Sequence, residues 1–188
     1  MTTKPCNVLF LCTGNSARSI LAESILRKEG AGRFRAFSAG SEPKGAVNPL
    51  ALDVLEDGGY PTEGLRSKSW EEFAEPGAPE MDLVITVCDN AAGEVCPIWP
   101  GHPTTAHWGI GDPASVEGSD AEKQEAFRQA LHYMKTRISQ LVVLPVEQIE
   151  EKTLRSKLQA IAQQAGASPG ALGGSSKGMV GENKTDGG

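Results

Sequence analysis

The residues between Cys12 and Ser19 have types and spacing suited to chemistry on an oxyanion. Cys12 follows the apolar run 8–11 and precedes five small or polar residues, then Arg18 and Ser19, where a helical pattern begins. A strand that ends in a tight loop and opens a helix directs several backbone N–H groups into one concavity at the positive end of the helix dipole. The pattern therefore predicts a cup for a negatively charged group, with the Cys12 thiol facing it.

The residue types in this oxyanion loop (residues 12–19) match that task. A nearby arginine, a helix N-terminus and hydroxyl donors each favour a thiolate, so we expect Cys12 to be ionised at neutral pH. The planar guanidinium of Arg18 can hold two oxygens of a tetrahedral oxyanion. Gly14 permits a tight turn and Asn15 tolerates a positive φ. The predicted oxyanion-binding residues are Thr13, Gly14, Asn15, Ser16, Ala17, Arg18 and Ser19.

Nucleotide loops are the competing interpretation of a strand–glycine–helix turn. No Gly-Lys-Ser or Gly-Lys-Thr follows Gly14, and no Gly-x-Gly-x-x-Gly occurs there, so neither a Walker loop nor a dinucleotide fingerprint is indicated. The remaining alternative is a Rossmann-like turn in which Cys12 packs against its neighbours and has no catalytic role.

Composition limits the classes of protein that this chain can be. Its 188 residues suit one domain of ordinary size, and 39% hydrophobic with 22% charged residues is typical of a globular protein. A net charge of −6 argues against a nucleic-acid partner. No apolar run approaches the ~20 residues of a membrane span and no signal peptide is evident, so we expect a cytoplasmic protein without a membrane partner. Four unevenly spaced cysteines do not form a disulfide framework, and no His or Cys spacing indicates a metal site.

Strand and helix patterns alternate along the first 145 residues. The apolar and β-branched runs predict strands over residues 7–11, 34–39, 82–87 and 104–108. The helical patterns lie over residues 20–30, 49–58 with an Asn48 cap, 69–73, and from Ser119 or Asp120 through Leu141. This alternation predicts an α/β fold with a parallel sheet covered on both faces.

The C-terminal quarter follows a different pattern. We expect residues 1–145 to form the main domain and residues 146–165 to form a helical extension that docks on it or stands out from it. Residues 166–188 hold eight of the 22 glycines and no aromatic residue, which predicts a disordered tail.

The loop and several later motifs together resemble a known family. The loop Cys-Thr-Gly-Asn-Ser-Ala-Arg-Ser is similar to the signature of the low-molecular-weight protein tyrosine phosphatase superfamily, and more closely of its arsenate reductase branch. The likeness covers residues 6–142, about three quarters of the chain. Its other motifs are Phe37-Ser38-Ala39-Gly40-Ser41, Val87-Cys88-Asp89, Cys96-Pro97 and His107-Trp108-Gly109-Ile110-Gly111-Asp112-Pro113. The resemblance implies a doubly wound, four-stranded parallel sheet with helices on both faces, here followed by the C-terminal helix and tail.

The resemblance also implies a role for five residues in arsenate reduction. Cys12 would attack arsenate held by Arg18 and the loop amides, while Asp112 protonates the departing oxygen. Cys88 would then attack Cys12, release arsenite and leave a disulfide. Cys96 would attack Cys88 and present a Cys88–Cys96 disulfide to an external reductant. Two later thiols distinguish this reaction from phosphate hydrolysis, because reduction needs two electrons.

Partners and alternatives follow from the same resemblance. The reductant would be thioredoxin, or a glutathione- or mycothiol-type small thiol with glutaredoxin, and the enzyme would carry no bound cofactor and act as a monomer. Some relatives bind potassium, and Asn15, Glu23 and Ser38 match those positions. The first alternative is a tyrosine phosphatase with a phosphocysteine at Cys12, although Ala114 stands where phosphatases usually place an aromatic residue. The second is a non-catalytic oxyanion-binding or redox-sensing module.

Overall fold

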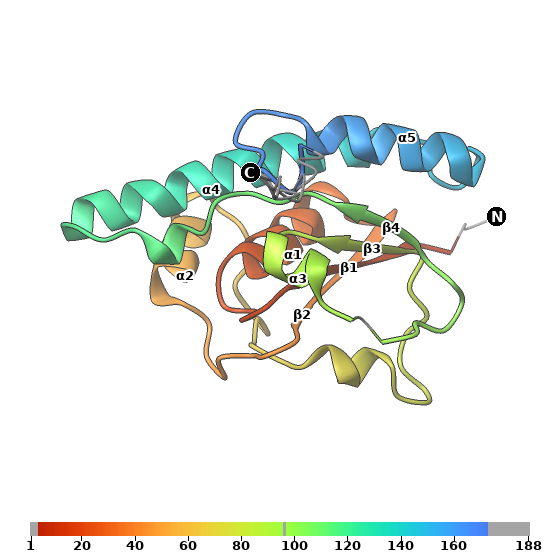
Figure 1. Cartoon of the computed structure of the whole chain (residues 1–188), viewed down its shortest axis with the longest axis horizontal. Helices are drawn as coiled ribbons and strands as arrows, with labels where there is room; N and C mark the ends of the chain where they lie inside the picture. Colours follow the sequence, from red (N-terminus) through yellow and green to blue (C-terminus); the bar gives the residue numbers. More distant parts are fainter. Residues whose placement is uncertain (1–3, 96, 173–188) are drawn as a thin grey trace, which may run out of the picture.

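Four parallel strands form the centre of the structure, a computed structural model that describes residues 4–95 and 97–172 (Figure 1). The strands are β1 (Cys6–Cys12), β2 (Phe34–Gly40), β3 (Leu83–Thr86) and β4 (Thr104–His107), in the order β2-β1-β3-β4. Every residue of β1 is buried, which explains its unbroken apolar pattern. Cys12 pairs in register with Gly40, and Leu11 with Thr86, so these three strands end at one edge of the sheet.

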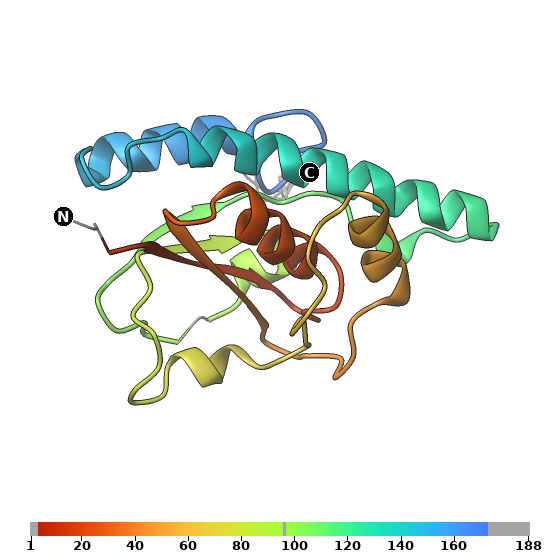
Figure 2. The ribbon, with the colours of Figure 1, turned by 180° about the vertical axis from the view of Figure 1, so that it is seen from behind.

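Helices cover one face of the sheet, and a thinner layer covers the other (Figures 1 and 2). The helical face carries α1 (Arg18–Glu29), α2 (Pro49–Asp57), α4 (Asp120–Val142) and α5 (Glu151–Ala162), which share one apolar core with Val8 and Phe10. On the opposite face, the short 3₁₀ helix η1 (Trp70–Phe73) and Trp99 pack on Leu9, Leu11 and Val84. Two further short helices, α3 (Asp89–Gly93) and η2 (Pro113–Ser115), follow β3 and β4.

The local signals in the sequence explain where the long helices begin. Asn48 accepts the Leu50 N–H and Pro49 fills the first position of α2. Ser119 and Glu122 form a reciprocal capping box that starts α4. The predicted α/β class, with four parallel strands, flanking helices and a C-terminal helix, is confirmed.

The structure differs from the predicted elements in two places. Residues 89–93, where the sequence pattern predicted no helix, form helix α3, which Cys88 caps by accepting the Ala91 N–H. The C-terminal helix begins at Glu151 rather than at 146, because the Gln148 N–H bonds to the Pro145 carbonyl at 2.9 Å and Glu150 adopts an extended conformation.

Helix α5 docks on the domain rather than standing out from it. Leu154, Leu158 and Ile161 are buried in the core shared with α1 and α4. The indole N–H of Trp108 donates to the Leu158 carbonyl at 2.9 Å. The helix is therefore part of the packed fold.

The first residues of the expected disordered tail are also packed. Ser168 N–H donates to the Gly109 carbonyl at 2.9 Å, and Ala167 forms an antiparallel bridge with Ile110. The expectation of a disordered tail is thus wrong for residues 166–172, because polar contacts with distant parts of the chain hold this segment although it buries little apolar surface. Residues 173–188 lie outside the described part. Within that part, no helix combines the length and apolar character needed to span a membrane.

Truncating Leu158 tests whether α5 is integral to the fold. We expect Leu158→Ala to lower the free energy of unfolding by about 2–5 kcal/mol, because Leu158 is fully buried. The exposed neighbour Ser156 serves as a control, and Ser156→Ala should change the free energy of unfolding by less than about 0.5 kcal/mol. Urea unfolding followed by tryptophan fluorescence measures both. A loss below about 1 kcal/mol for Leu158→Ala would mean that α5 adds little to the core.

Candidate functional site

The oxyanion loop turns its carbonyl groups outward. Three backbone carbonyls accept N–H groups from the segment 42–48: Thr13 from Glu42 at 3.0 Å, Gly14 from Lys44 at 3.0 Å and Ser16 from Asn48 at 2.9 Å. The loop N–H groups are consequently directed to its inner side, where the Asn15 N–H lies 3.2 Å from Cys12 Sγ. Helix α1 begins at Arg18 with no side-chain cap, so its first-turn N–H groups add to the same positive concavity.

Asn15 fixes the shape of this loop. It adopts a left-handed backbone conformation with φ of 41°, as its residue type predicts, and is completely buried. Its side-chain amide donates to Ser19 Oγ at 2.9 Å and to Ser38 Oγ at 3.0 Å. Its side-chain oxygen accepts the Lys68 N–H at 2.9 Å. Three separate segments of the chain therefore hold the residue that bends the loop.

Gly40 allows the loop to approach β2. A Cβ atom at this position would lie 2.4 Å from the Thr13 carbonyl oxygen and 3.0 Å from the Asn15 backbone nitrogen. Only glycine fits so close to another backbone. The Phe37–Ser41 motif is thus part of the wall behind the loop.

Cys12 lies at the bottom of the concavity with only 4% of its surface exposed. Its Sγ is 2.9 Å from Ser19 Oγ. Burial raises the pKa of the Cys12 thiol above its ordinary value, against the lowering effects of Ser19 and Arg18. Desolvation therefore opposes the expected thiolate at neutral pH, while the donors around the sulfur favour it.

Arg18 and Asp112 meet at the mouth of the concavity. Arg18 Nη2 lies 3.5 Å from Asp112 Oδ2, and Nη1 donates to the Ile110 carbonyl at 3.0 Å. Asp112 caps η2 by accepting the Ala114 N–H at 3.0 Å, and its side chain is 38% exposed. The cation expected to bind an oxyanion and the carboxyl group expected to donate a proton thus lie side by side.

Cys88 reaches the same edge of the sheet on the neighbouring strand. The Val87 N–H bonds to the Leu11 carbonyl at 2.8 Å, which aligns the ends of β3 and β1. Cys88 Sγ lies 3.7 Å from Thr13 Oγ1 and is 2% exposed. The third predicted thiol, Cys96, lies outside the described residues.

These residues enclose a pocket of about 310 Å³. It is lined by Cys12, Thr13, Gly14, Ser16, Ala17, Arg18, Glu42, Lys44, Asn90, Asp112 and Ala114. Larger hollows of about 400, 520 and 560 Å³ occur elsewhere, but none of the three is lined by a cysteine. Sequence reasoning did not identify Lys44 and Asn90, since no motif links them to the loop.

A family comparison agrees with this geometry. The family model for low molecular weight phosphotyrosine protein phosphatases matches residues 7–159. The chain belongs to this family. A relative from Halalkalibacterium halodurans, an arsenate reductase, is 38% identical over 122 residues, which cover 65% of this chain and 84% of the relative. The family named from the sequence motifs is confirmed.

Solved structures of the family show the same architecture. An arsenate reductase in its oxidized state has a TM-score of 0.60 at 29% identity, covering 72% of this chain and 95% of that one. An arsenate reductase in a phosphate-binding state has a TM-score of 0.54 at 27% identity, covering 73% and 96%.

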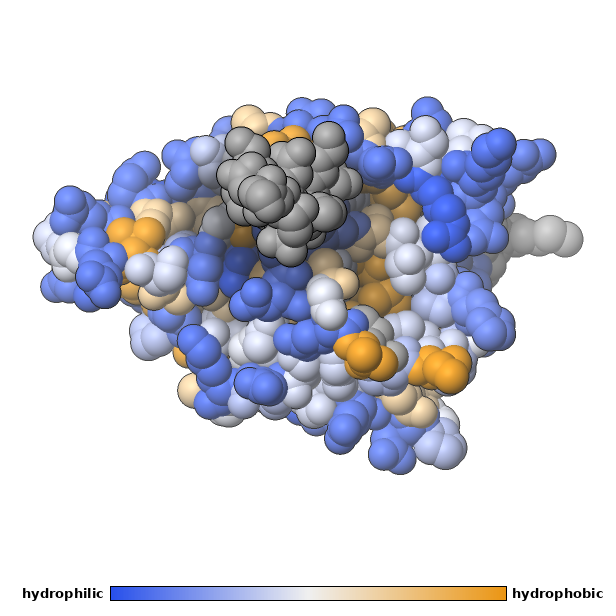
Figure 3. Space-filling model, viewed as in Figure 1, coloured by the Kyte–Doolittle hydropathy of each residue, from blue (hydrophilic) through white to orange (hydrophobic). Residues whose placement is uncertain are grey.

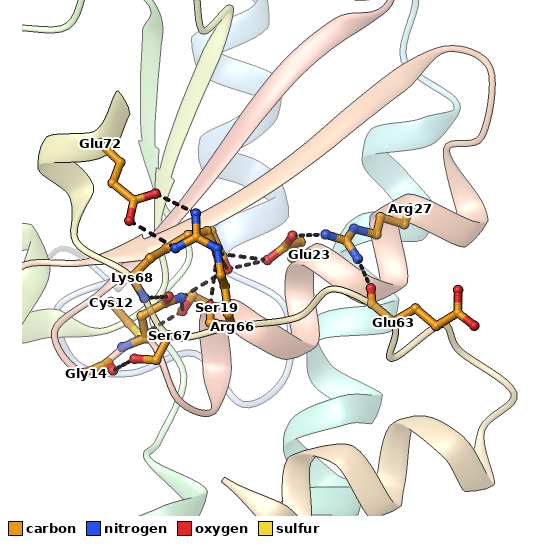
Figure 4. Close-up of polar contacts among 12 residues, drawn as sticks. Cys12, Gly14, Ser19, Glu23, Arg27, Glu63, Arg66, Ser67, Lys68 and Glu72 are labelled. Carbon is orange, nitrogen blue, oxygen red and sulfur yellow. Dashed lines mark hydrogen bonds and ion pairs between the residues drawn. The ribbon is translucent and has the colours of Figure 1, made fainter. Parts of the chain in front are cut away.

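Hydrogen bonds bring together Asn15, Glu23 and Ser38, the residues expected to bind potassium, behind the loop. Lys68 lies beside Glu23 (Figure 4). Ser38 Oγ donates to Glu23 Oε2, and the Asn15 amide contacts the same hydroxyl. Lys68 Nζ lies 3.7 Å from Glu23 Oε2 and 3.5 Å from Ser38 Oγ, and donates to the Arg66 carbonyl at 3.0 Å. A second cation beside this ammonium group would be repelled, so these residues do not fit potassium.

Lys68 acts as a built-in counter-charge to a buried carboxylate. The Glu23 and Lys68 side chains are 3% and 7% exposed. Burial lowers the pKa of Lys68, and the facing Glu23 opposes that change. Arg27, one turn further along α1, also pairs with Glu23. No sequence motif marked Lys68, because its role depends on contacts 30 and 45 residues away.

Cation dependence of stability tests the role of Lys68. Potassium should not raise the Tm of the natural protein above its value in sodium or choline chloride at equal ionic strength. Lys68→Ala should lower the free energy of unfolding by about 3–5 kcal/mol, because it breaks a buried ion pair. Potassium should raise the Tm of this variant. Lys152→Ala, at an exposed position, is the control. A potassium-specific rise in the Tm of the natural protein would contradict this assignment.

The pH dependence of Cys12 alkylation tests the balance of forces on its sulfur. Because the pKa is raised, the iodoacetamide rate at Cys12 should increase with pH through a midpoint above the ordinary thiol value. Ser19→Ala removes a contact that lowers the pKa, so the midpoint should move further upward. Peptide-resolved mass spectrometry measures the rate. A midpoint near neutrality in the natural protein would show that the loop N–H groups outweigh burial.

Proposed function

We propose that this protein is an arsenate reductase in which Cys12 attacks arsenate and Cys88 supplies the second thiol. The observation that carries the proposal is the placement of Cys12 and Cys88 at the ends of adjacent strands, with Cys88 Sγ 3.7 Å from the hydroxyl of Thr13, the residue after Cys12. A single thiol suffices for phosphate transfer, whereas reduction of arsenic by two electrons requires two. Support also comes from the relatives named arsenate reductase and from the phosphate-binding structure, since phosphate and arsenate are both tetrahedral oxyanions.

The first step forms a sulfur–arsenic bond. Arsenate enters the 310 Å³ pocket, where Arg18 and the loop N–H groups hold its oxygens. Cys12 Sγ attacks arsenic and loses its proton, and one oxygen departs as water with a proton from Asp112. In sum, the Cys12 thiol and hydrogen arsenate react to give the thiol–arsenate adduct and water. The proton that leaves the thiol returns to Asp112 through solvent. The pairing of Arg18 with Asp112 keeps the donor at the pocket mouth until the anion arrives.

The second step carries the reduction. Cys88 Sγ attacks the Cys12 sulfur, and the electron pair of the sulfur–arsenic bond leaves with arsenic as As(V) becomes As(III). The Cys88 proton goes to the arsenite oxygen, and the two sulfurs, each oxidised by one electron, form a disulfide. The Thr13 hydroxyl, 3.7 Å from Cys88 Sγ, holds the second thiol next to the residue that follows Cys12.

The disulfide must then be passed on and reduced by an external reductant before the enzyme can react again. Cys96 would attack Cys88 and free Cys12, which moves the disulfide to the Cys88–Cys96 pair. Val95 and Ile98, beside Cys96 in the sequence, are 96% and 88% exposed. Figure 3 shows that apolar side chains on this face form small separate patches on a mostly hydrophilic surface. Packing against Val95 and Ile98 would suit a protein reductant, thioredoxin or glutaredoxin, better than a small thiol acting alone.

Single-turnover chemistry tests the two-thiol proposal. Reduced protein mixed with arsenate, without any reductant, should release about one arsenite per chain and gain a disulfide that includes Cys88. Cys12→Ser should release none, and Cys88→Ser should lower release at least about 100-fold because the adduct has no second thiol to attack it. Cys6→Ser is the matched control and should behave as the natural protein, because Cys6 lies at the opposite end of β1.

The tyrosine phosphatase alternative predicts the reverse pattern. Cys88→Ser would then hydrolyse aryl phosphates as fast as the natural protein. In the natural protein, aryl phosphate hydrolysis would match or exceed arsenate turnover. Cys12, Arg18 and Asp112 alone could support that reaction, although Ala114 lines the pocket where an aromatic residue would hold a phosphotyrosine ring. Full arsenate turnover by Cys88→Ser would overturn the proposed relay.

A further inference from the structure

Asp89, the residue after Cys88, connects the short helix α3 to a distant part of the chain. Asp89 Oδ1 accepts the Ser168 hydroxyl at 2.5 Å, and Oδ2 accepts the Gly170 N–H at 3.1 Å. His107 Nδ1 lies 2.8 Å from the Thr86 hydroxyl, and its Nε2 lies 2.8 Å from Asp89 Oδ1. One carboxylate at the start of α3 is therefore bound by two residues from the C-terminal segment and one from the end of β4.

The space around this carboxylate requires two glycines. A Cβ atom on Gly109 would lie 2.1 Å from Ser168 Oγ and 2.5 Å from Asp89 Oδ1. A Cβ atom on Gly170 would lie 2.5 Å from Asp89 Oδ1 and 2.6 Å from its Cγ. Real Cβ atoms do not approach so closely, so the absence of side chains at both positions is what admits the contact.

A buried arginine anchors the other end of the same segment. Arg137 of α4 is fully buried and donates to the carbonyls of Ala162, Gln164 and Ala165, at 3.3, 3.2 and 3.1 Å. From that point the chain pairs with Ile110 through Ala167 before it reaches Asp89. Residues 166–172 thus form a strap that runs from the end of α5 to the start of α3.

Helix α3 depends on such an anchor because it is only five residues long. A helix of this length is not stable by itself and needs tertiary contacts. Burial pushes the pKa of Asp89 upward, but the hydrogen bonds from Ser168, His107 and Gly170 outweigh it, so the pKa lies below its ordinary value. A lowered pKa shows that the carboxylate form is favoured where the strap binds it.

We propose that this strap holds the Cys88 helix closed, positioning the Cys88 thiol beside Thr13 and restricting its access to solvent. Cys88 is buried, yet an external reductant can act on it only after α3 has moved. The strap contacts set how often that movement occurs. The importance of the strap for catalysis rests on the proposed function of Cys88. The restraint of α3 by the strap does not depend on that function.

Cys88 alkylation in the full-length protein, without arsenate, measures the clamping directly. Ser168→Ala removes one hydrogen bond, and Gly170→Ala introduces a clash with Asp89; neither changes the charge near Cys88. Each should increase the iodoacetamide rate at Cys88 about tenfold, the effect expected from loss of one hydrogen bond to a charged group. Leu172→Ala changes an exposed strap residue that does not touch Asp89 and should stay within about twofold of the natural protein.

The Cys6 thiol serves as the internal reference in the same samples. It lies at the opposite end of the sheet, so a local change at the strap should leave its alkylation rate unchanged. A rise at Cys88 with an unchanged rate at Cys6 supports a local clamp. Unchanged Cys88 rates in both variants, or equal rises at both cysteines, would overturn the proposal. Because no arsenate is present, this result is independent of whether the protein reduces arsenate.

Discussion

The left-handed conformation of Asn15 is the constraint on which the rest of the site depends. It bends the backbone so that the loop carbonyls face the 42–48 segment and the N–H groups face Cys12. This conformation strains the backbone of a non-glycine residue. Three hydrogen bonds offset the strain: the Asn15 amide donates to Ser19 and Ser38, and its side-chain oxygen accepts the Lys68 N–H. These contacts connect the loop to α1, to β2 and to the Lys68 segment. The anion cup is therefore rigid before any ligand arrives, and binding needs little reorganisation.

Burial of Cys12 has two opposed consequences. Removal of water disfavours the thiolate, which raises the pKa and keeps the resting thiol protected from unspecific oxidation. The same lack of water strengthens the interaction of Arg18 and the loop N–H groups with a bound oxyanion. Reactivity is thereby concentrated on a ligand small enough for the pocket and able to exchange a proton with the thiol. A more exposed cysteine would ionise more easily and discriminate less.

The features that were predictable from the sequence are those set by neighbouring residues. The apolar run before Cys12, the Asn48-Pro49 cap and the Ser119–Glu122 capping box each specify local structure, and all agree with the observed elements. Lys68 and Ser168 could not be recognised in this way. Their partners Glu23 and Asp89 lie 45 and 79 residues away, and only the folded chain brings them together. The same holds for the thiol pKa of Cys12, because desolvation depends on what packs above the loop rather than on the loop residues.

Cys12 and Cys88, the two thiols of the proposed reaction, are held in different ways. Cys12 ends a completely buried central strand, and its loop is held by contacts from several elements. Cys88 instead caps a five-residue helix held through one exposed carboxylate. The proposed two-thiol relay would use this difference, because its first sulfur holds an anion in place while its second meets two partners in turn. Gly109 and Gly170 make the release feasible: they admit polar contacts in place of interlocked side chains, and polar contacts can be exchanged for water at small net cost.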